Sequence, residues 1–255
     1  MKITMSRTYL KIIRFKYRII QILFPRNYYI LSLITPFTKL CKFLCSESEI
    51  KESTVYLEKN GYVYHPINAK NWDIAHIIAN LSDGNFLDMG SSDSYILENV
   101  IKTGIKGQKY GIDLREPDNR LEQVNYIVGD LMNTNLKDNF FHNITCLSVI
   151  EHEVNFDKFA SEVSRLLVNK GKLYLTFDYW EPKILSQIKL YGLQWNPLDR
   201  NDVNTLVKTL NNYDLHLIQN INWDTKEAII TPANHSPDST KSYTFGMLVF
   251  QKNNL

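Results

Sequence analysis

The sequence predicts an α/β fold in which a mostly parallel sheet carries helices on both faces and ends in an antiparallel hairpin. Short apolar runs alternate with segments of helical periodicity between residues 74 and 210, and this alternation is typical of a parallel sheet. The run 142–150 is almost wholly apolar or small, as a buried central parallel strand requires. The runs 215–223 and 243–251 have no helical pattern between them, which favours a closing hairpin.

The first half of the domain is expected to contain two helices and two strands. Apolar residues at helical spacing predict the first helix: Ile74, Ile77, Ile78 and Leu81. A strand is expected over 85–90, a helix over 95–102 and a second strand over 109–114. The alternation of these elements makes two parallel strands the simplest arrangement.

The second half continues the same order. Strands are expected over 125–131, 142–150 and 171–177. Between the last two, a helix is expected from its apolar residues, with Asn155 as its N-cap: Phe156, Phe159, Ala160, Val163 and Leu167. A further helix starts at Asp199 or Asn201 and contains Val203, Leu206, Val207 and Leu210.

Charge divides the chain into a basic arm, 1–46, and a domain, 47–255. The arm contains nine Lys or Arg residues and no acid, whereas the remainder contains 20 basic and 27 acidic residues. Phosphate backbones are bound by clustered Lys and Arg, so the domain is not expected to bind nucleic acid. The three cysteines, Cys41, Cys45 and Cys146, lack metal-ligand spacing; no metal is expected, and a reducing compartment such as the cytoplasm fits best.

The arm has the pattern of a basic amphipathic helix. Arg7, Lys11, Arg14 and Arg18 fall within about 60° of one another on a helical wheel. Three interpretations stay open: a peripheral helix at an anionic membrane through residues 7–24, a helical extension packed on the domain or a partner, and a cleaved organellar presequence. The apolar runs are shorter than the ~20 residues that span a bilayer.

Polar groups follow each apolar strand, at the edge where open α/β sheets bind ligands. They are Asp88, Asp113, Asp130, Glu151 with His152, and Asp178. Gly90 lets a ligand approach the backbone, and a carboxylate at Asp113 is placed to reach ribose hydroxyls. These features fit an adenosine-containing ligand; the alternative is a tight turn and helix caps. G-x-G-x-x-G is absent, so NAD is the weaker candidate.

The stretch from Asn85 to Tyr179 resembles the class I S-adenosylmethionine-dependent methyltransferases, in the branch with "EH" after the fourth strand. The matching motifs are "DMGSSDS" from Asp88, "YGIDL" with Asp113, "GDL" with Asp130, "SVIEHE" and "EVSRLLVNKGKLYLTF". The resemblance implies a three-layer Rossmann-like fold with a seven-stranded sheet whose last strand is antiparallel. Ser92 and Ser94 stand where the family prefers glycine.

The resemblance also implies where the cofactor, S-adenosyl-L-methionine, binds. Its contacts are expected at Asp88, Gly90, Ser91, Ser92, Asp113, Leu114, Asp130, Leu131, Ser148 and Val149. His152 is the candidate general base or acceptor orienter, because a neutral imidazole accepts protons, and Glu151 is the candidate partner. Asp178, Tyr179 and Trp180 are candidates for substrate binding.

The sequence thus predicts a methyltransferase that acts on an oxygen or nitrogen atom of a small molecule or glycan. It is expected in the cytoplasm, with peripheral membrane attachment as an open possibility for the arm. The alternative is a noncatalytic methyltransferase-like scaffold docked to a membrane or partner through the basic arm. Residues 180–199 and 224–242 are expected to form the lid, because they are long connections near the active edge.

Overall fold

The computed structural model describes residues 37–92, 94–225, 227–231 and 242–253. The predicted basic helix therefore lies outside the described residues, as does Asp93, near which the helix after the first predicted strand was expected to begin. The chain divides into two compact units, Met1–Thr38 and Lys39–Leu255, and the second includes residues 39–46 of the predicted arm. In the part of the chain that the structure describes, no helix is long and apolar enough to cross a membrane.

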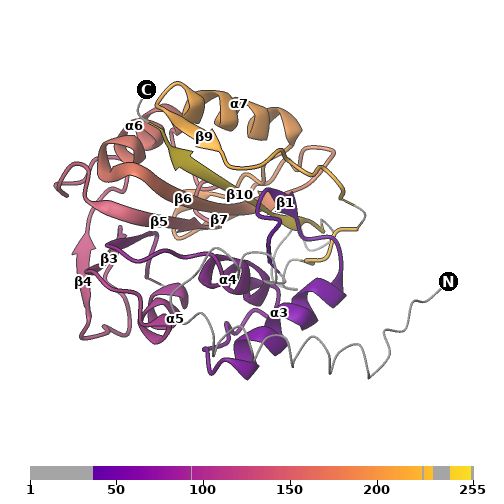
Figure 1. Cartoon of the computed structure of the whole chain (residues 1–255). Helices are drawn as coiled ribbons and strands as arrows, with labels where there is room; N and C mark the ends of the chain where they lie inside the picture. The colour runs from indigo at the N-terminus through magenta and orange to yellow at the C-terminus, as the bar shows by residue number, and fades with distance from the viewer. Residues whose placement is uncertain (1–36, 93, 226, 232–241, 254–255) are drawn as a thin grey trace. The chain divides into compact units, whose positions relative to one another are not determined.

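The second unit is a three-layer α/β domain (Figure 1). Its strands β2 (Phe86–Met89), β3 (Lys109–Asp113), β4 (Val124–Val128), β5 (Phe141–Leu147) and β6 (Leu167–Tyr179) are parallel neighbours. β10 (Thr244–Lys252) runs antiparallel to β6. The strand order is β1-β10-β6-β5-β2-β3-β4, with β9 also paired to β10. The predicted α/β fold with a parallel sheet and an antiparallel end is confirmed.

Within the residues that the structure describes, the sheet has eight strands rather than the seven expected. The additional strand, β1 (Lys42–Phe43), pairs antiparallel with Gly246 and Met247 of β10. β9 (Leu215–Leu217) pairs with the other end of the same edge, from Phe250 to Lys252. The strand expected over 215–223 is therefore much shorter, because β1 occupies the rest of that edge.

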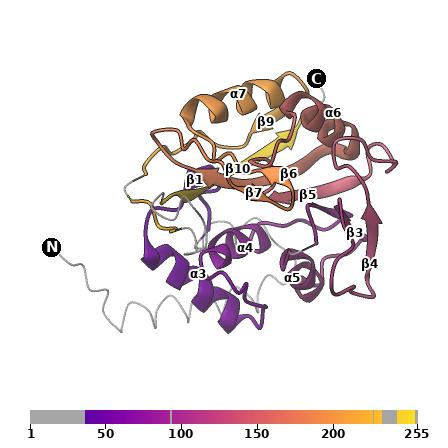
Figure 2. The same cartoon turned by 180° about the vertical axis from the view of Figure 1, so that it is seen from behind.

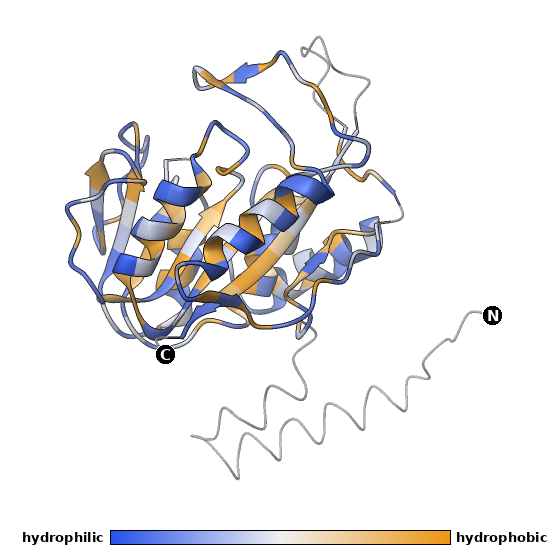
Figure 3. Cartoon of the chain, turned by 90° about the horizontal axis from the view of Figure 1, so that it is seen from above, coloured by the Kyte–Doolittle hydropathy of each residue, from blue (hydrophilic) through white to orange (hydrophobic). Residues whose placement is uncertain are grey.

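Helices cover both faces of the sheet, as Figures 1 and 2 show from opposite sides. α3 (Glu47–Lys59), α4 (Lys70–Ile78) and α5 (Ile96–Thr103) lie on one face, and α6 (Phe156–Leu166) and α7 (Arg200–Asn211) on the other. The strands are mainly hydrophobic while the helices alternate hydrophobic and hydrophilic residues (Figure 3), because only one side of each helix packs on the sheet.

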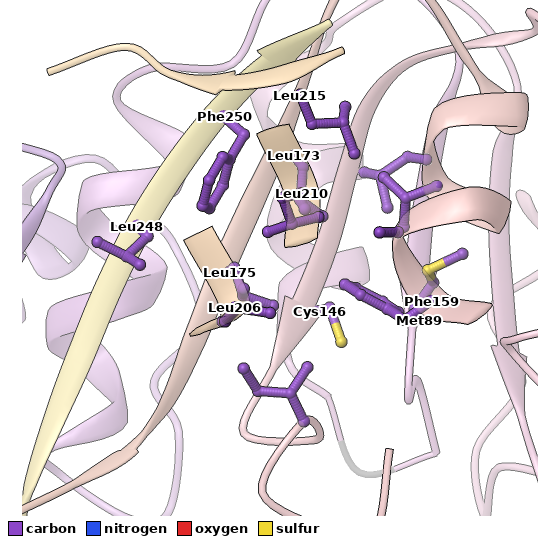
Figure 4. Close-up of a cluster of buried hydrophobic side chains, with 14 of the residues drawn as sticks. Met89, Cys146, Phe159, Leu173, Leu175, Leu206, Leu210, Leu215, Leu248 and Phe250 are labelled. Atoms are coloured by element: carbon purple, nitrogen blue, oxygen red, sulfur yellow. The ribbon is translucent and has the colours of Figure 1, made fainter. Parts of the chain in front are cut away.

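The core between the sheet and α6 and α7 is built of aliphatic and aromatic side chains (Figure 4). It includes Met89, Cys146, Phe159, Leu173, Leu175, Leu206, Leu210, Leu215, Leu248 and Phe250. Burying such a side chain contributes about 1.5–3 kcal/mol. This packing holds the sheet rigid, so the loops after its strands start from fixed positions.

Candidate functional site

The turn after β2 brings the backbone close to the loop after β5. Gly90 has φ +87°, and its N–H donates to Ile112 O at 2.8 Å. A Cβ at this position would lie 2.3 Å from Val149 Cγ2. Only glycine fits both the backbone angle and the space, so the chain leaves β2 in a tight turn at the carboxyl edge of the sheet.

Asp88 lies buried at the start of this turn. Its Oδ1 accepts a hydrogen bond from Thr145 Oγ1 at 2.6 Å, and its Oδ2 is buried without a hydrogen bond to the described residues. Burial raises the pKa of Asp88 to about 6, against the lowering effect of the Thr145 and Ser94 hydroxyls. A buried oxygen without a partner is costly, and it marks a place where a ligand can supply a donor.

Asp113 ties the ends of β2 and β3 together. Its Oδ2 accepts from Ser92 N at 3.0 Å and its Oδ1 from Arg115 N at 3.2 Å. A carboxylate offers about four acceptor positions, so both oxygens can accept further donors. The predicted cofactor residues Gly90, Ser92 and Asp113 are thus brought together.

Two large apolar side chains stand exposed beside Asp113. Leu114 is 61% exposed and Val128 is 51% exposed, at the ends of adjacent strands β3 and β4. Leu114 was predicted from the sequence, whereas Val128 was missed because it reads as an ordinary strand residue. Exposed apolar groups at a ligand edge fit a planar ring, which would remove them from water.

Asp130 and Leu131 follow β4. Asp130 is exposed, and its Oδ1 accepts from Met132 N at 2.8 Å. Leu131 is 9% exposed and belongs to the hydrophobic core. Gly129 N donates to Asp113 O at 2.8 Å, so this loop begins beside Asp113.

The loop after β5 carries Ser148, Val149, Glu151 and His152. Ser148 has φ +51°, and its hydroxyl contacts the Lys70 ammonium. His152 is half-buried, and its Nδ1 makes no hydrogen bond with the described residues. Burial and the Lys70 charge lower the pKa of His152, so its imidazole is neutral at neutral pH.

Glu151 and Asp178 form a buried carboxyl pair at the ends of β5 and β6. Glu151 is 1% exposed and Asp178 6%, and Asp178 N donates to Glu151 Oε1 at 3.2 Å. Burial, and then the Asp178 charge, raises the pKa of Glu151 well above its usual value. Burial also raises the pKa of Asp178 to about 6, although Lys70 and hydrogen bonds from Trp195 and Glu151 oppose this. Both carboxyls therefore hold their protons to higher pH than exposed carboxyls do, and they titrate as a pair.

The three residues predicted to bind substrate are placed differently from one another. Asp178 accepts from Trp195 Nε1 at 2.7 Å. Tyr179 is 1% exposed and packs on Phe43, with ring centroids 4.2 Å apart. Trp180 is half-buried. Tyr179 thus packs with β1 and is not brought together with the carboxyl pair.

Two further side chains lie at the site. Lys70 was missed from the sequence, whereas Trp195 belongs to the segment 180–199 that was expected to form a lid. Lys70 starts α4, and the sequence signal for this helix began only at Ile74. Trp195 lies beyond the hairpin of β7 (Lys189–Leu190) and β8 (Leu193–Gln194). Both reach the site through contacts that span many residues of sequence, and no local pattern reveals such contacts.

The β7–β8 hairpin belongs to the expected lid segment 180–199. Its tip residue Tyr191 is 72% exposed, and the Arg115 guanidinium lies 4.6 Å from the centroid of its ring. Arg115 directly follows Leu114, so the hairpin, which follows β6 in the chain, contacts the loop after β3.

These features together fit an adenosine-containing ligand. Gly90 permits the tight turn against Val149, Asp113 offers acceptors for ribose hydroxyls, and Leu114 and Val128 offer an apolar surface. The buried Asp88 Oδ2 offers an acceptor that the described residues leave unused.

Comparisons with known proteins indicate what kind of domain carries this edge of the sheet. Residues 87–175 match the family model described as a methyltransferase domain. The chain matches no curated protein.

Two solved structures share the fold. One is the complex between the Haloferax volcanii Trm112 methyltransferase activator and a methyltransferase, with 12% identity, a TM-score of 0.53, and coverage of 83% of this chain and 100% of that one. The other is the YcgJ protein from Bacillus subtilis, with 15% identity, a TM-score of 0.50, and coverage of 72% and 99%. The family model, the fold and the motifs from Asp88 to Phe177 agree, and the chain carries a methyltransferase domain of the S-adenosylmethionine-dependent kind over residues 87–175.

Proposed function

We propose that this enzyme methylates an oxygen or nitrogen atom of a small molecule or glycan at the carboxyl edge of its sheet. The observation that carries this proposal is the hydrogen bond from Ser92 N to the Asp113 carboxylate, which links the turn after β2 to the end of β3. The Gly90 turn lies on one side of Asp113 and the exposed Leu114 on the other. The adenosine of the cofactor would lie at Asp113 and Leu114, and its methionine part at the Gly90 turn.

The cofactor assignments follow the position of each side chain. Asp113 would accept hydrogen bonds from the ribose hydroxyls, and Leu114 and Val128 would cover the base. Asp88 and the turn Gly90, Ser91 and Ser92 would hold the methionine part. The remaining contacts are assigned to Asp130, Leu131, Ser148 and Val149.

The acceptor side is assigned to the loop after β5 and the end of β6. When bound, S-adenosylmethionine supplies an electrophilic methyl group on a sulfonium. Transfer is an in-line displacement, so the protein mainly aligns the reacting atoms and excludes water. His152 would take the proton of the acceptor or orient it, because its ring is neutral and its Nδ1 has no described hydrogen bond. Glu151, Asp178 and Trp180 would position the acceptor; Tyr179, packed on Phe43, is the weakest of these assignments.

The charge of this edge favours an uncharged hydroxyl or an amine as the acceptor. Acidic side chains predominate here: Asp88, Asp113, Asp130, Glu151 and Asp178. Lys70 is the cation that contacts this loop, and it already lies against Asp73 and Ser148. A phosphate or carboxylate acceptor would meet repulsion from the carboxylates.

Cofactor binding tests the proposal by titration calorimetry with S-adenosylmethionine and S-adenosylhomocysteine. Asp113→Ala removes two charge-assisted hydrogen bonds to ribose, about 3 kcal/mol or roughly 100-fold in Kd. Asp113→Asn keeps an oxygen for Ser92 N, and it separates loss of ribose contacts from loss of the turn. The exposed Asp118 gives the matched control, since Asp118→Ala should bind like wild type. Equal affinities for wild type and Asp113→Ala would exclude this cofactor site.

We also propose that the enzyme works in the cytoplasm and that residues 7–24 attach it to an anionic membrane surface. Cys41 and Cys146 are buried free thiols, which a reducing compartment maintains. Replacing Arg7, Lys11, Arg14 and Arg18 by Glu should abolish flotation with vesicles that contain anionic lipid, since each basic residue near the surface contributes about 1 kcal/mol. Undiminished flotation of this variant would contradict the membrane proposal.

A further inference from the structure

Lys70 is a nearly buried cation at the centre of the acceptor side. It is the first residue of α4, and its side chain is 13% exposed. Its Nζ contacts Ser148 Oγ, lies 3.4 Å from Asp73 Oδ2 and stands 4.1 Å from the centroid of the Phe245 ring. Three elements therefore meet at one ammonium group: α4, the end of β5 and β10.

The same ammonium lies over the residue that pairs with Asp178 in the sheet, since Phe245 of β10 is the partner of Asp178 of β6. The ionisable and hydrogen-bonding groups that act on Asp178 come from each element packed around it: Lys70 and Asp73 from α4, Glu151 from the loop after β5, Trp195 from the segment after β8, and Tyr243 just before β10. Among these groups, Lys70 is the cation.

Two buried carboxyls at this distance resist ionisation, because each desolvated charge raises the free energy of the other. Lys70 lowers the pKa of both Asp178 and Glu151 and thereby opposes this effect. Without it, both carboxyls would hold their protons to higher pH. With it, the ionised form is favoured at Asp178, which accepts from Trp195 Nε1.

We propose that Lys70 is a positioning residue for methyl transfer, which fixes Ser148 at the end of β5 and favours the ionised form of the Glu151–Asp178 pair. This inference rests on the proposed function only for its consequence, the charge of the acceptor side. An acceptor hydroxyl or amine would then meet a site with a net hydrogen-bond-accepting character.

A role as a structural ion pair alone would need only Asp73. Lys70 also contacts Ser148, on the loop that carries Glu151 and His152, and the Phe245 ring of β10, and its charge acts on His152 as well. The two roles differ in a measurable way, because a structural pair leaves the titration of Asp178 unchanged when the protein stays folded.

Carboxyl titration by ¹³C NMR of the full chain, labelled at Asp and Glu side chains, measures this directly. Asp178→Asn and Glu151→Gln assign the two signals. In wild type, the Asp178 signal should titrate with a midpoint near pH 6. Lys70→Met should raise that midpoint by about one unit or more, since a nearby opposite charge lowers a carboxyl pKa by about 1–3 units.

Three further variants separate charge from packing. Lys70→Arg keeps the charge, so the midpoint should stay within about half a unit of wild type. Lys70→Gln keeps an N–H donor for Ser148 but loses the charge, and it should behave like Lys70→Met. Lys102→Met removes an exposed lysine that also pairs with an acid on its own helix, Glu98, and should leave the midpoint unchanged.

An unchanged Asp178 midpoint in folded Lys70→Met or Lys70→Gln would overturn the inference, and so would a large shift in Lys70→Arg. Calorimetry with S-adenosylhomocysteine on the same samples keeps the two proposals apart. If wild type does not bind it, the proposed cofactor site fails whatever the titrations show. If wild type binds it and the midpoint does not move, only the role of Lys70 fails.

Discussion

At the scale of single residues, the turn after β2 depends on Gly90. Its backbone is in a region that side chains rarely adopt, and the space beside it is filled by Val149. Gly104, at the end of α5, has a similar φ of +73°, but a Cβ there would meet nothing within 4 Å. Substituting both glycines therefore distinguishes two effects: backbone strain, which both positions share, and steric conflict, which only Gly90 has.

Gly90→Ala should lower the free energy of unfolding by about 2–4 kcal/mol, the sum of left-handed strain and overpacking against Val149. It should also weaken S-adenosylhomocysteine binding, because the turn must shift. Urea unfolding and calorimetry measure the two effects.

Gly104→Ala is the matched control, with an expected loss of about 1–2 kcal/mol from strain alone and unchanged cofactor affinity. The double variant Gly90→Ala/Val149→Ala should recover part of the stability. Equal losses in Gly90→Ala and Gly104→Ala would show that the contact with Val149 is unimportant.

The sequence identified the acidic residues of the candidate site because each directly follows an apolar strand. Asp88, Asp113 and Asp178 needed only the rule that parallel strands end at one edge. Lys70 and Trp195 could not be found in this way, since they reach Ser148 and Asp178 from a helix start and from a loop beyond a hairpin. Side chains that arrive across the sheet are set by packing, which no local pattern encodes.

At the scale of elements, the helices begin at side chains that satisfy their free backbone N–H groups. Asn155 Oδ1 accepts from Lys158 N at 3.0 Å at the start of α6. Asp199 and Asp202 form a reciprocal capping box at the start of α7. The sequence predicted the Asn155 cap and left Asp199 and Asn201 as alternatives for the second cap, which is Asp199. The helices that these caps start pack on the core that supports β5 and β6.

Asn155→Ala should lower the free energy of unfolding by about 1 kcal/mol, the usual effect of losing an N-cap. Asn155→Asp should retain the stability, because its carboxylate accepts the same hydrogen bond. Thermal and urea unfolding measure both variants. A loss in Asn155→Asp as large as that in Asn155→Ala would contradict the capping role.

The elements that the sequence misjudged lie at one edge of the sheet. Residues 42–43 were assigned to the arm by charge, yet they form β1 and pair with β10. Cys41 O accepts from Asn222 N at 2.9 Å, where a continuation of β9 was expected. Two segments almost 180 residues apart share this edge, and the choice between them depends on side-chain fit with Phe177 and Tyr179.

At the scale of the whole domain, buried ionisable groups make stability depend on pH. His76 in α4 is 4% exposed, and its Nδ1 lies 2.7 Å from Trp72 O. Burial lowers the pKa of His76 to about 3. Between that value and the ordinary histidine pKa of about 6.5, the unfolded chain binds a proton that the folded chain does not, so folding weakens as pH falls.

The unfolding free energy of wild type relative to His76→Gln should therefore fall by about 1.4 kcal/mol per pH unit between pH 6 and pH 4. Glutamine keeps a donor for Trp72 O and does not titrate. Comparing the two proteins cancels the opposite contribution of Asp88, whose pKa of about 6 makes the folded state bind a proton in the same range. A pH-independent difference would show that His76 takes up a proton in the folded domain as readily as in the unfolded chain.

The alternation of strands and helices was enough to predict a parallel sheet with an antiparallel end. It did not give the order of the strands in the sheet, such as β5 between β2 and β6, because the periodicity of each strand is the same whichever strand lies beside it. The proposed cofactor site depends on that order, since it places the turn after β2 beside the ends of β3 and β4.

A crystal structure of the chain with S-adenosylhomocysteine tests that claim most directly. We expect the ribose hydroxyls to donate hydrogen bonds to the Asp113 carboxylate, the base to pack against Leu114 and Val128, and the sulfur to lie near Ser148 and His152. A structure with the ligand bound elsewhere, or with protein side chains filling the space between Gly90 and Asp113, would contradict it.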